Sequence, residues 1–265
     1  MNTTEIQHRI QNAKVLDFGT IFNQSIELFK KVWVQGLVAL ILNIVLAIPV
    51  FLIMYIPMLL LGLSSVFLDP SPYDPYDSYS EPDLSIIMVF FMVVIYLFMI
   101  VAMSTIGLGL KAAFYRICKF KDLEELGKED YFYFFKKPYL GKTIKIGLAF
   151  TGISVLAAFL CFLPLLYVIV PLSFMVIGYA FNPDLSVSEI VKLAFELGNK
   201  KWLISFGLML VSGFLAMIVG FLMCGLGIYV TSSFGYLPSY FIYKEVVGFD
   251  EESDQMRRIE QLSTN

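Results

Sequence analysis

The sequence predicts an all-α membrane protein with six transmembrane helices, arranged as three units that each join an amphipathic helix to a helical hairpin. The first observation is composition: 58% of the 265 residues are hydrophobic and only 15% are charged, whereas a soluble domain carries roughly 25% charged residues. The second is a set of apolar runs near or above the ~20 residues that a membrane-spanning helix needs. The third is the distribution of basic residues along the chain.

Basic residues avoid one set of loops completely. All 19 Lys and Arg residues lie within residues 9–31, 111–145, 192–201 and 244–258, and none lies in 64–85 or in the turns at 162–165 and 225–227. Cytoplasmic loops of membrane proteins carry the excess of Lys and Arg. We therefore expect both termini to be cytoplasmic (N-in/C-in), which requires an even number of spans.

The chain divides by polarity into three parts. A polar N-terminal segment, 1–16, precedes a six-span membrane domain, 17–245, and a charged C-terminal tail, 246–265. The membrane domain consists of units 17–116, 117–181 and 182–245. We expect the N-terminal segment to be loose and the tail to be a short helix or disordered. No apolar core precedes residue 32, so we expect the first span to act as the insertion signal.

The first unit opens with an amphipathic stretch, 17–31. Its apolar face recurs at helical spacing and consists of Phe18, Ile21, Phe22, Ser25, Leu28, Phe29 and Val32. Lys30, Lys31 and Trp33 come next, and basic and Trp residues favour the membrane–water interface. We expect this helix to lie along the membrane surface, with Lys30, Lys31 and Trp33 as interfacial anchors.

The first span, 32–68, is apolar for far longer than a bilayer needs, and it contains Pro49 and Pro57. It could be one helix kinked at Pro49, a helix that protrudes from the membrane, or a broken helix. Asn43 is the most polar residue deep in this run. A buried amide usually bonds a neighbouring helix, and we favour that role for Asn43. The alternative is that it lines a substrate path.

An acidic outer loop, 69–83, joins the first span to a second long apolar run, 84–116. It repeats Pro-Tyr-Asp at 72–74 and 75–77 and continues with Ser-Tyr-Ser at 78–80; polyproline II has three residues per turn. A Pro-rich acidic linker is the favoured interpretation. The alternative is an extracytoplasmic docking strip for a partner, or a weak cation site, formed by Tyr73, Asp74, Tyr76, Asp77 and Tyr79. Because both runs are long, we expect this hairpin to stand proud of the membrane.

The second unit begins with a mixed-charge loop and an aromatic run at 131–135, closed by Lys136, Lys137 and Tyr139. Aromatic residues beside lysines can stack nucleic-acid bases, but at a membrane surface we favour interfacial anchoring by these residues. Two apolar stretches, 143–162 and 164–181, then form a hairpin with a very short turn.

The third unit opens with Ser186 and Glu189 in the spacing of a capping box, which predicts an amphipathic helix over 186–200. Lys200, Lys201 and Trp202 follow as predicted anchors, and a fifth span at 202–223 carries small residues four apart at Ser212, Ala216 and Gly220. The sixth predicted span, 228–243, contains Pro238 and a hydroxyl cluster. The hydroxyl cluster consists of Thr231, Ser232 and Ser233. Together with Asn43, these are the predicted buried polar residues.

The first and third units share a spacing. Glu27 precedes Lys31 by four residues and Trp33 by six, and Glu196 precedes Lys200 and Trp202 in the same way. We interpret this as an internal repeat; the alternative is convergence, because every span that starts on the cytoplasmic side favours Lys and Trp at that boundary.

Four segments carry a resemblance to known proteins: residues 22–33, residues 188–202, the Gly-containing turn at 224–227 and the ending YFIYKEVVG at 240–248. The layout resembles a group of multi-pass bacterial inner-membrane proteins that includes the membrane domain of some glycerophosphoryl diester phosphodiesterases and the YciC-like proteins. The resemblance implies a six-helix domain in the bacterial cytoplasmic membrane with no established activity. The long outer loop departs from that compact pattern.

Residues typical of catalysis are scarce. His8 is the single histidine, the three cysteines are widely spaced, and the sequence has no Gly-rich phosphate loop and no Gly-x-Ser-x-Gly elbow. We therefore expect no catalytic residues, no cofactor and no metal. No ionisable residue lies in the central part of any span, which argues against proton-coupled transport.

These observations favour a non-catalytic accessory or scaffold subunit of a cell-envelope complex. It would contact membrane lipids and a membrane or periplasmic protein partner, but no nucleic acid. The alternative is a transporter or lipid-handling protein for uncharged or amphiphilic substrates, which would need a cavity lined by Asn43 and residues 231–233. A third possibility is an enzyme that uses the acidic loop residues Glu124, Glu125, Glu129 and Asp130 at the lipid surface.

Overall fold

The computed structural model describes residues 2–68, 86–125, 127–160, 163–223, 225 and 227–249, and within these ranges the protein is all-helical, as predicted. The elements in chain order are α1 (Thr3–Gln11), α2 (Phe18–Leu68), α3 (Ile86–Asp122), the 3-10 helix η1 (Tyr133–Phe135), α4 (Lys137–Phe159), α5 (Leu163–Phe181), α6 (Val187–Lys200), α7 (Trp202–Leu222), α8 (Gly227–Thr231), the 3-10 helix η2 (Ser232–Tyr236) and α9 (Leu237–Val246).

In the described ranges, five helices are long and apolar enough to cross a membrane: α2, α3, α4, α5 and α7. The sixth predicted span is not one continuous helix, because 228–243 is divided among α8, η2 and α9. The hydroxyl of Thr231 bonds the carbonyls of Ala216 (2.7 Å) and Gly227 (3.0 Å). Hydroxyls that bond the backbone compete with the helical ladder, and Pro238 lacks an N–H to continue it. These residues explain why the helix is interrupted at 232–236.

The helix α2 is continuous over 51 residues, past both Pro49 and Pro57. Of the three arrangements considered for the first span, the broken helix is therefore wrong. The separate surface helix expected at 17–31 is also wrong, because that stretch is the first part of α2. Its predicted apolar face is nevertheless the buried one: Ile21, Ser25, Leu28 and Val32 are each at most 3% exposed. The face packs on protein, with Phe22 and Phe29 against the ring of Phe234.

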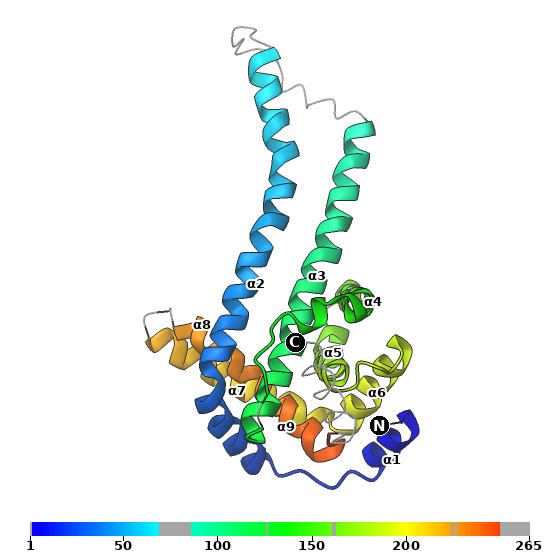
Figure 1. Ribbon diagram of the computed structural model, residues 1–265, viewed down its shortest axis with the longest axis vertical. Helices are drawn as coiled ribbons and strands as arrows, with labels where there is room; N and C mark the ends of the chain where they lie inside the picture. Colours follow the sequence, from blue (N-terminus) through cyan, green and yellow to red (C-terminus); the bar gives the residue numbers. More distant parts are fainter. Residues whose placement is uncertain are drawn as a thin grey trace.

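The remaining helices gather around one end of the α2/α3 pair (Figure 1). We call this region the packed end: α1, η1, α6 and α9 with the neighbouring parts of α2, α3 and α5. The other half of the pair, residues 45–59 of α2 and 90–100 of α3, is left uncovered by the other helices (Figure 1). We call it the apolar arms, because the large hydrophobic side chains described there are broadly exposed, Leu52 by 57% and Phe91 by 61%. The outer loop 69–83 lies outside the described residues.

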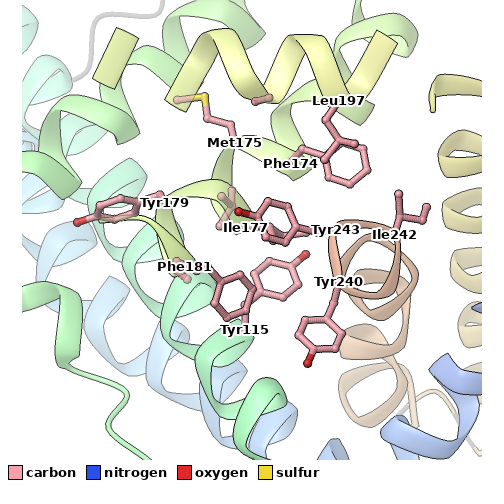
Figure 2. Close-up of a cluster of buried hydrophobic side chains, with 14 of the residues drawn as sticks. Tyr115, Phe174, Met175, Ile177, Tyr179, Phe181, Leu197, Tyr240, Ile242 and Tyr243 are labelled. Atoms are coloured by element: carbon pink, nitrogen blue, oxygen red, sulfur yellow. The ribbon is translucent and has the colours of Figure 1, made fainter. Parts of the chain in front are cut away.

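Aromatic side chains with satisfied hydroxyls fill the packed end (Figure 2). Tyr115, Tyr179 and Tyr240, from three different helices, are all fully buried. Tyr179 shares a 2.7 Å hydrogen bond with Thr143, and the Tyr240 hydroxyl donates to Asp122 at 2.8 Å. Buried phenols need such partners, so this core specifies which residues of α3, α4, α5 and α9 face one another.

The helix α6 begins with the predicted capping box. Ser186 and Glu189 exchange hydrogen bonds, with the Ser186 amide donating to Glu189 at 2.8 Å. The apolar face of α6 does not lie on a membrane surface, as it packs on α5 and α1. At Gly198 the approach to α5 is close enough that an added Cβ would come within 2.8 Å of Pro171 Cγ.

The N-terminal segment is not loose as expected, because residues 3–11 form α1 against α6. Ile6 and Ile10 are buried on one face of α1. Thr3 donates to Glu189 at 2.7 Å, and Arg9 donates to the carbonyl of Val247 at 2.7 Å. The start of the predicted tail is likewise packed, since Val246 and Val247 are buried. Residues 250–265 lie outside the described part.

Candidate functional site

A cavity of about 320 Å³ lies between α2, α3 and η2. We call it the α2/α3/η2 cavity. Three of the four predicted buried polar residues, Asn43, Ser232 and Ser233, line it, although 189 positions of sequence separate Asn43 from Ser232. The fourth, Thr231, does not line it; its hydroxyl donates to the carbonyls of Ala216 and Gly227. The complete lining is Gly36, Ala39, Leu40, Asn43, Ile44, Gly107, Leu110, Lys111, Phe114, Ser232, Ser233 and Tyr236.

The interruption of the sixth predicted span creates this site. It places the 3-10 turn η2, rather than a regular helix, against α2 and α3. Gly36 permits the contact, because a Cβ at this position would lie 2.3 Å from Ser233 Oγ and 2.5 Å from Ser233 Cβ. Such separations are far below van der Waals contact, so any larger residue at 36 must displace η2 or close the cavity.

Lys111 places a cation in the cavity. Its ammonium nitrogen lies 4.0 Å from the centroid of the Tyr236 ring, close enough for a cation–π interaction. Among the described residues, no carboxylate forms an ion pair with it. Sequence patterns alone did not indicate a role for Lys111, because it lies toward the end of the second span among the basic residues expected to be cytoplasmic. The available signal was a single lysine inside the apolar run 106–115.

Ser233 contributes a hydroxyl without a partner. The residue is only 3% exposed, and its Oγ has no hydrogen-bond partner in the described structure. Asn43 is half-buried, with its amide facing Gly107 across the α2/α3 contact. Buried polar atoms are usually paired. A hydroxyl and an ammonium that line the same cavity, without a hydrogen-bond or carboxylate partner among the described residues, therefore mark a place where a polar ligand group would be stabilised.

The cavity is amphipathic. Leu40, Ile44, Leu110 and Phe114 supply an apolar wall opposite these polar groups. Ile44 and Tyr236 are 49% and 38% exposed, so the cavity opens to the surroundings at their edge. Its volume is at the lower end of the ~300–1,000 Å³ typical of small-molecule sites. A molecule with one polar and one apolar part would match this lining.

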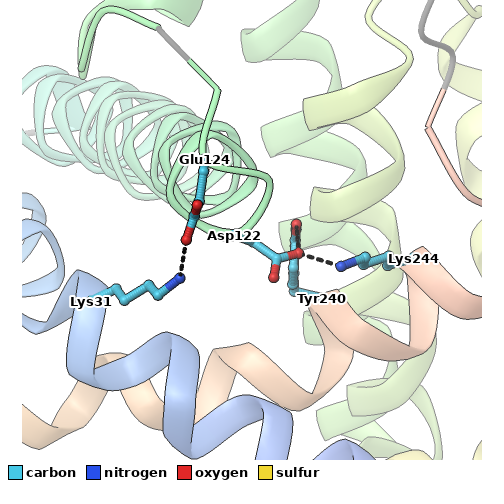
Figure 3. Close-up of polar contacts among 5 residues, drawn as sticks. All are labelled: Lys31, Asp122, Glu124, Tyr240 and Lys244. Carbon is cyan, nitrogen blue, oxygen red and sulfur yellow. Dashed lines mark hydrogen bonds and ion pairs between the residues drawn. The ribbon is translucent and has the colours of Figure 1, made fainter.

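A second hollow, of about 420 Å³, lies between the start of α2, the end of α3 and α9. Figure 3 shows Lys31, Asp122 and Lys244 of its lining with their polar partners. Asp122 accepts from the Lys244 ammonium at 2.6 Å and from the Tyr240 hydroxyl at 2.8 Å. Lys31, at its rim, pairs with Glu124 at 3.1 Å. The charges of this hollow are thus matched by partners within the protein, in contrast to Lys111.

The acidic loop residues do not form a cluster. Glu124 pairs with Lys31, Glu129 with Lys121 at 2.7 Å, and Asp130 with Lys136 at 2.7 Å. Nor do three or more His, Cys, Asp or Glu side chains come together in a way that could hold a metal, in the part of the chain that is described.

The predicted anchors fall into two groups. Lys30, Lys31, Trp33, Lys136, Lys137 and Lys200 are exposed, whereas Tyr139, Lys201 and Trp202 are partly or fully covered. Lys201 donates to the carbonyls of Ala13 and Lys14 at 3.4 and 2.5 Å, and its burial lowers the pKa of its ammonium. The Trp202 indole donates to the Tyr167 carbonyl at 3.0 Å. These two side chains therefore make protein contacts.

The aromatic run 131–135 also makes protein contacts. Tyr133 and Phe134 are buried, and Tyr133 stacks on Tyr139 with ring centroids 4.7 Å apart. Phe134 lies 4.7 Å from the Tyr179 ring, and the Arg116 guanidinium lies 3.8 Å from the Tyr133 centroid. The predicted docking residues Tyr73, Asp74, Tyr76, Asp77 and Tyr79 lie outside the described residues.

No family model, curated protein or solved structure matches the chain. The sequence and structure together define an all-helical membrane protein with several long apolar helices, and the α2/α3/η2 cavity is the candidate site.

Proposed function

We propose that this is a non-catalytic, multi-pass membrane protein that binds an amphiphilic molecule in the α2/α3/η2 cavity. The supporting observation is the convergence of Asn43, Lys111 and Ser233, from three separate elements, on one cavity with an apolar wall. This is the lipid-handling or transport function considered as the alternative from the sequence. The scaffold function becomes the second candidate.

The proposed place of the cavity is within one leaflet, close to the packed end. Trp33 is 43% exposed, and exposed Trp side chains favour the interface. The α2 residues of the cavity, Gly36 to Ile44, follow Trp33 by three to eleven positions. At roughly 1.5 Å per residue they lie about 4.5–16.5 Å deeper, between the interface and roughly the midplane of a hydrocarbon core of ~30 Å.

The proposed topology keeps six crossings with both termini cytoplasmic, in a bacterial inner membrane as the resemblance implies. The chain leaves the packed end along α7 and returns through α8, η2 and α9, and α9 packs beside the first part of α2. The sixth crossing would then be an interrupted helix. Interrupted helices are tolerated in membranes where they are covered by protein or line a cavity.

Photocrosslinking tests the proposed site. The protein is reconstituted in vesicles that contain a phospholipid analogue with a diazirine on its acyl chain, irradiated and mapped by mass spectrometry. We expect adducts on the cavity residues of α2 and α3, and loss of these adducts when Gly36→Leu or Asn43→Leu fills the cavity. Gly213→Leu is the matched control, because nothing lies within 4 Å of a Cβ there. Adducts that persist at the same sites in both filled variants would rule the site out.

The second candidate, an accessory or scaffold subunit, is favoured by the length of the first hairpin. At about 1.5 Å per residue, the 51 residues of α2 span about 75 Å, more than twice the ~30 Å hydrocarbon core. The hairpin would carry the loop 69–83 beyond the bilayer, where a membrane or periplasmic protein could dock. Purification in a mild detergent tests this: absence of a stoichiometric partner would argue against it.

A further inference from the structure

Lys111 is an ammonium group in an amphipathic cavity, and no acid of the described protein neutralises it. From its position we propose that the amphiphile carries an anionic headgroup, a phosphate or carboxylate, that binds the Lys111 ammonium and the Ser233 hydroxyl. This inference rests on the proposed function and narrows it to one class of ligand.

The contrast with other lysines supports the assignment. Lys31, Lys121, Lys136 and Lys244 each pair with a carboxylate at 2.6–3.1 Å. Lys111 is more enclosed than Lys31 or Lys136. Among the described residues, however, its ammonium has no carboxylate partner and contacts the face of the Tyr236 ring instead. A covered charge without a counter-charge is costly, and an ionisable residue within a membrane span usually marks a functional site. An anion supplied by a ligand would complete the site.

Ser233 provides a second, independent indication. The residue lines the same cavity as the ammonium, and its hydroxyl, buried against Gly36, has no hydrogen-bond partner among the described residues. A hydroxyl is a good donor to an anionic oxygen, and charge-assisted hydrogen bonds are stronger than neutral ones. Both groups would therefore be satisfied by the same headgroup.

The antiparallel pairing of α2 and α3 also gives the ligand a direction. A Cβ on Gly36 would lie near Phe114, and a Cβ on Gly107 would lie near Asn43. Lys111 lies between residues 107 and 114 of α3, and therefore between the level of Asn43 and the level of Gly36. Ser233 lies at the level of Gly36, which is the one nearer the packed end. The headgroup would therefore lie toward the packed end, and the acyl chain would pass Asn43 and leave at Ile44 toward the bilayer centre.

Binding of a matched lipid pair to the full chain in a non-ionic detergent tests the inference. Short-chain phosphatidic acid and diacylglycerol of equal chain length differ by the anionic phosphate alone, and native mass spectrometry can count both. We expect the anionic lipid to bind at least about tenfold more tightly, the effect of one charge-assisted hydrogen bond. Lys111→Gln should abolish the preference, Lys111→Arg should keep it, and Ser233→Ala should reduce it.

The matched control is Lys121→Gln, since Lys121 pairs with Glu129 outside the cavity. Equal affinity for both lipids, with binding still blocked by Gly36→Leu, would overturn the anionic headgroup but leave the proposed function standing. Absence of lipid binding at the cavity would overturn both. Inorganic phosphate is tested as a competitor: if it displaces the lipid at comparable concentration, the acyl chain contributes nothing and the site is one for a free anion.

Discussion

The packed end and the apolar arms share two helices, yet they are built for different surroundings. Residues of α2 and α3 at the packed end are covered by other helices, as Val32 and Tyr115 show with no exposed surface. Farther along the same helices, Leu52 and Phe91 keep more than half of their surface exposed. Helix geometry is the same in both regions, so the difference lies in what covers the side chains.

This difference indicates where lipid replaces protein. In water, exposed apolar area costs about 25 cal/mol per Å², and soluble proteins rarely expose large contiguous apolar patches. In a bilayer the same surface carries no such cost. The α2/α3/η2 cavity lies at the boundary: Phe114 and Ser233 belong to its packed side, and Ile44 belongs to its exposed side. A site at that boundary has access to molecules that dissolve in the membrane.

The largest expected difference between the regions concerns aromatic side chains. Phe134 is fully buried against Tyr179, and Phe134→Ala should destabilise the protein by about 3–5 kcal/mol, the usual cost of an aromatic-to-alanine change in a core. Phe91→Ala, on the arms, should change stability by less than about 0.5 kcal/mol. Thermal unfolding of the purified protein in one detergent measures both. Equal losses would mean that the arms are also packed, against a second copy or a partner.

A smaller effect is expected where the two regions meet. Gly36→Ala should cost about 1–3 kcal/mol, because its Cβ would overlap Ser233 and overpacking has this typical cost. Gly213→Ala lies in open space on α7 and should be neutral or stabilising by up to about 1 kcal/mol, since Ala is the better helix former. The same unfolding assay compares them. A neutral Gly36→Ala would show that η2 can move away from α2, so that the cavity is adjustable.

Two ion pairs, one largely buried and one exposed, should differ in how much each contributes to stability. The Asp122 side chain is 14% exposed and accepts from both Tyr240 and Lys244, so Asp122→Asn should cost about 1–3 kcal/mol through weaker bonds to buried partners. Glu27 pairs with Lys30 while 68% exposed, and Glu27→Gln should cost about 0–1 kcal/mol, as exposed pairs do. If both substitutions had the same small effect in chemical denaturation, the Asp122 cluster would be solvated rather than structural.

Patterns within single segments predicted the local structure correctly. The Ser186/Glu189 spacing identified the start of α6, and the apolar periodicity at 17–31 identified the buried face of α2. The same patterns could not say what covers a face. The face of α2 was expected to meet lipid and instead meets α9 and η2, because periodicity records only that a face is apolar and both surroundings favour apolar side chains.

Long-range contacts explain the remaining differences. Ile6 and Ile10 gave a weak apolar signal in a polar segment, and only the presence of α6 makes them a buried face. Lys111 looked like one of many cytoplasmic lysines, and only the position of η2 encloses it. Asn43 and residues 231–233 were predicted from the sequence as buried polar residues, and together as the lining that a transport cavity would need. The meeting of three of them in one cavity depends on the interruption of 228–243, which hydroxyls and Pro238 cause in combination.

The smallest predicted effect is the pH dependence of the contact between α1 and α6, at the exposed surface of the packed end. Hydrogen bonds from Ser186 and Thr3 lower the pKa of Glu189 from its ordinary 4.5 to about 2. Because the folded pKa lies below the unfolded one, the contact favours the α1–α6 packing above pH 4.5 and is lost as the pH falls towards 2. A spin label at residue 4, in a variant without the three native cysteines, should become more mobile across this range.

Glu189→Gln should remove the pH dependence, whereas Glu196→Gln, which alters only the neighbouring contact with Gln7, should retain it. Unchanged mobility from pH 5 to pH 2 in the parent protein would show that Ile6 and Ile10 alone hold α1, so that the packed end depends on apolar burial even at its most polar surface.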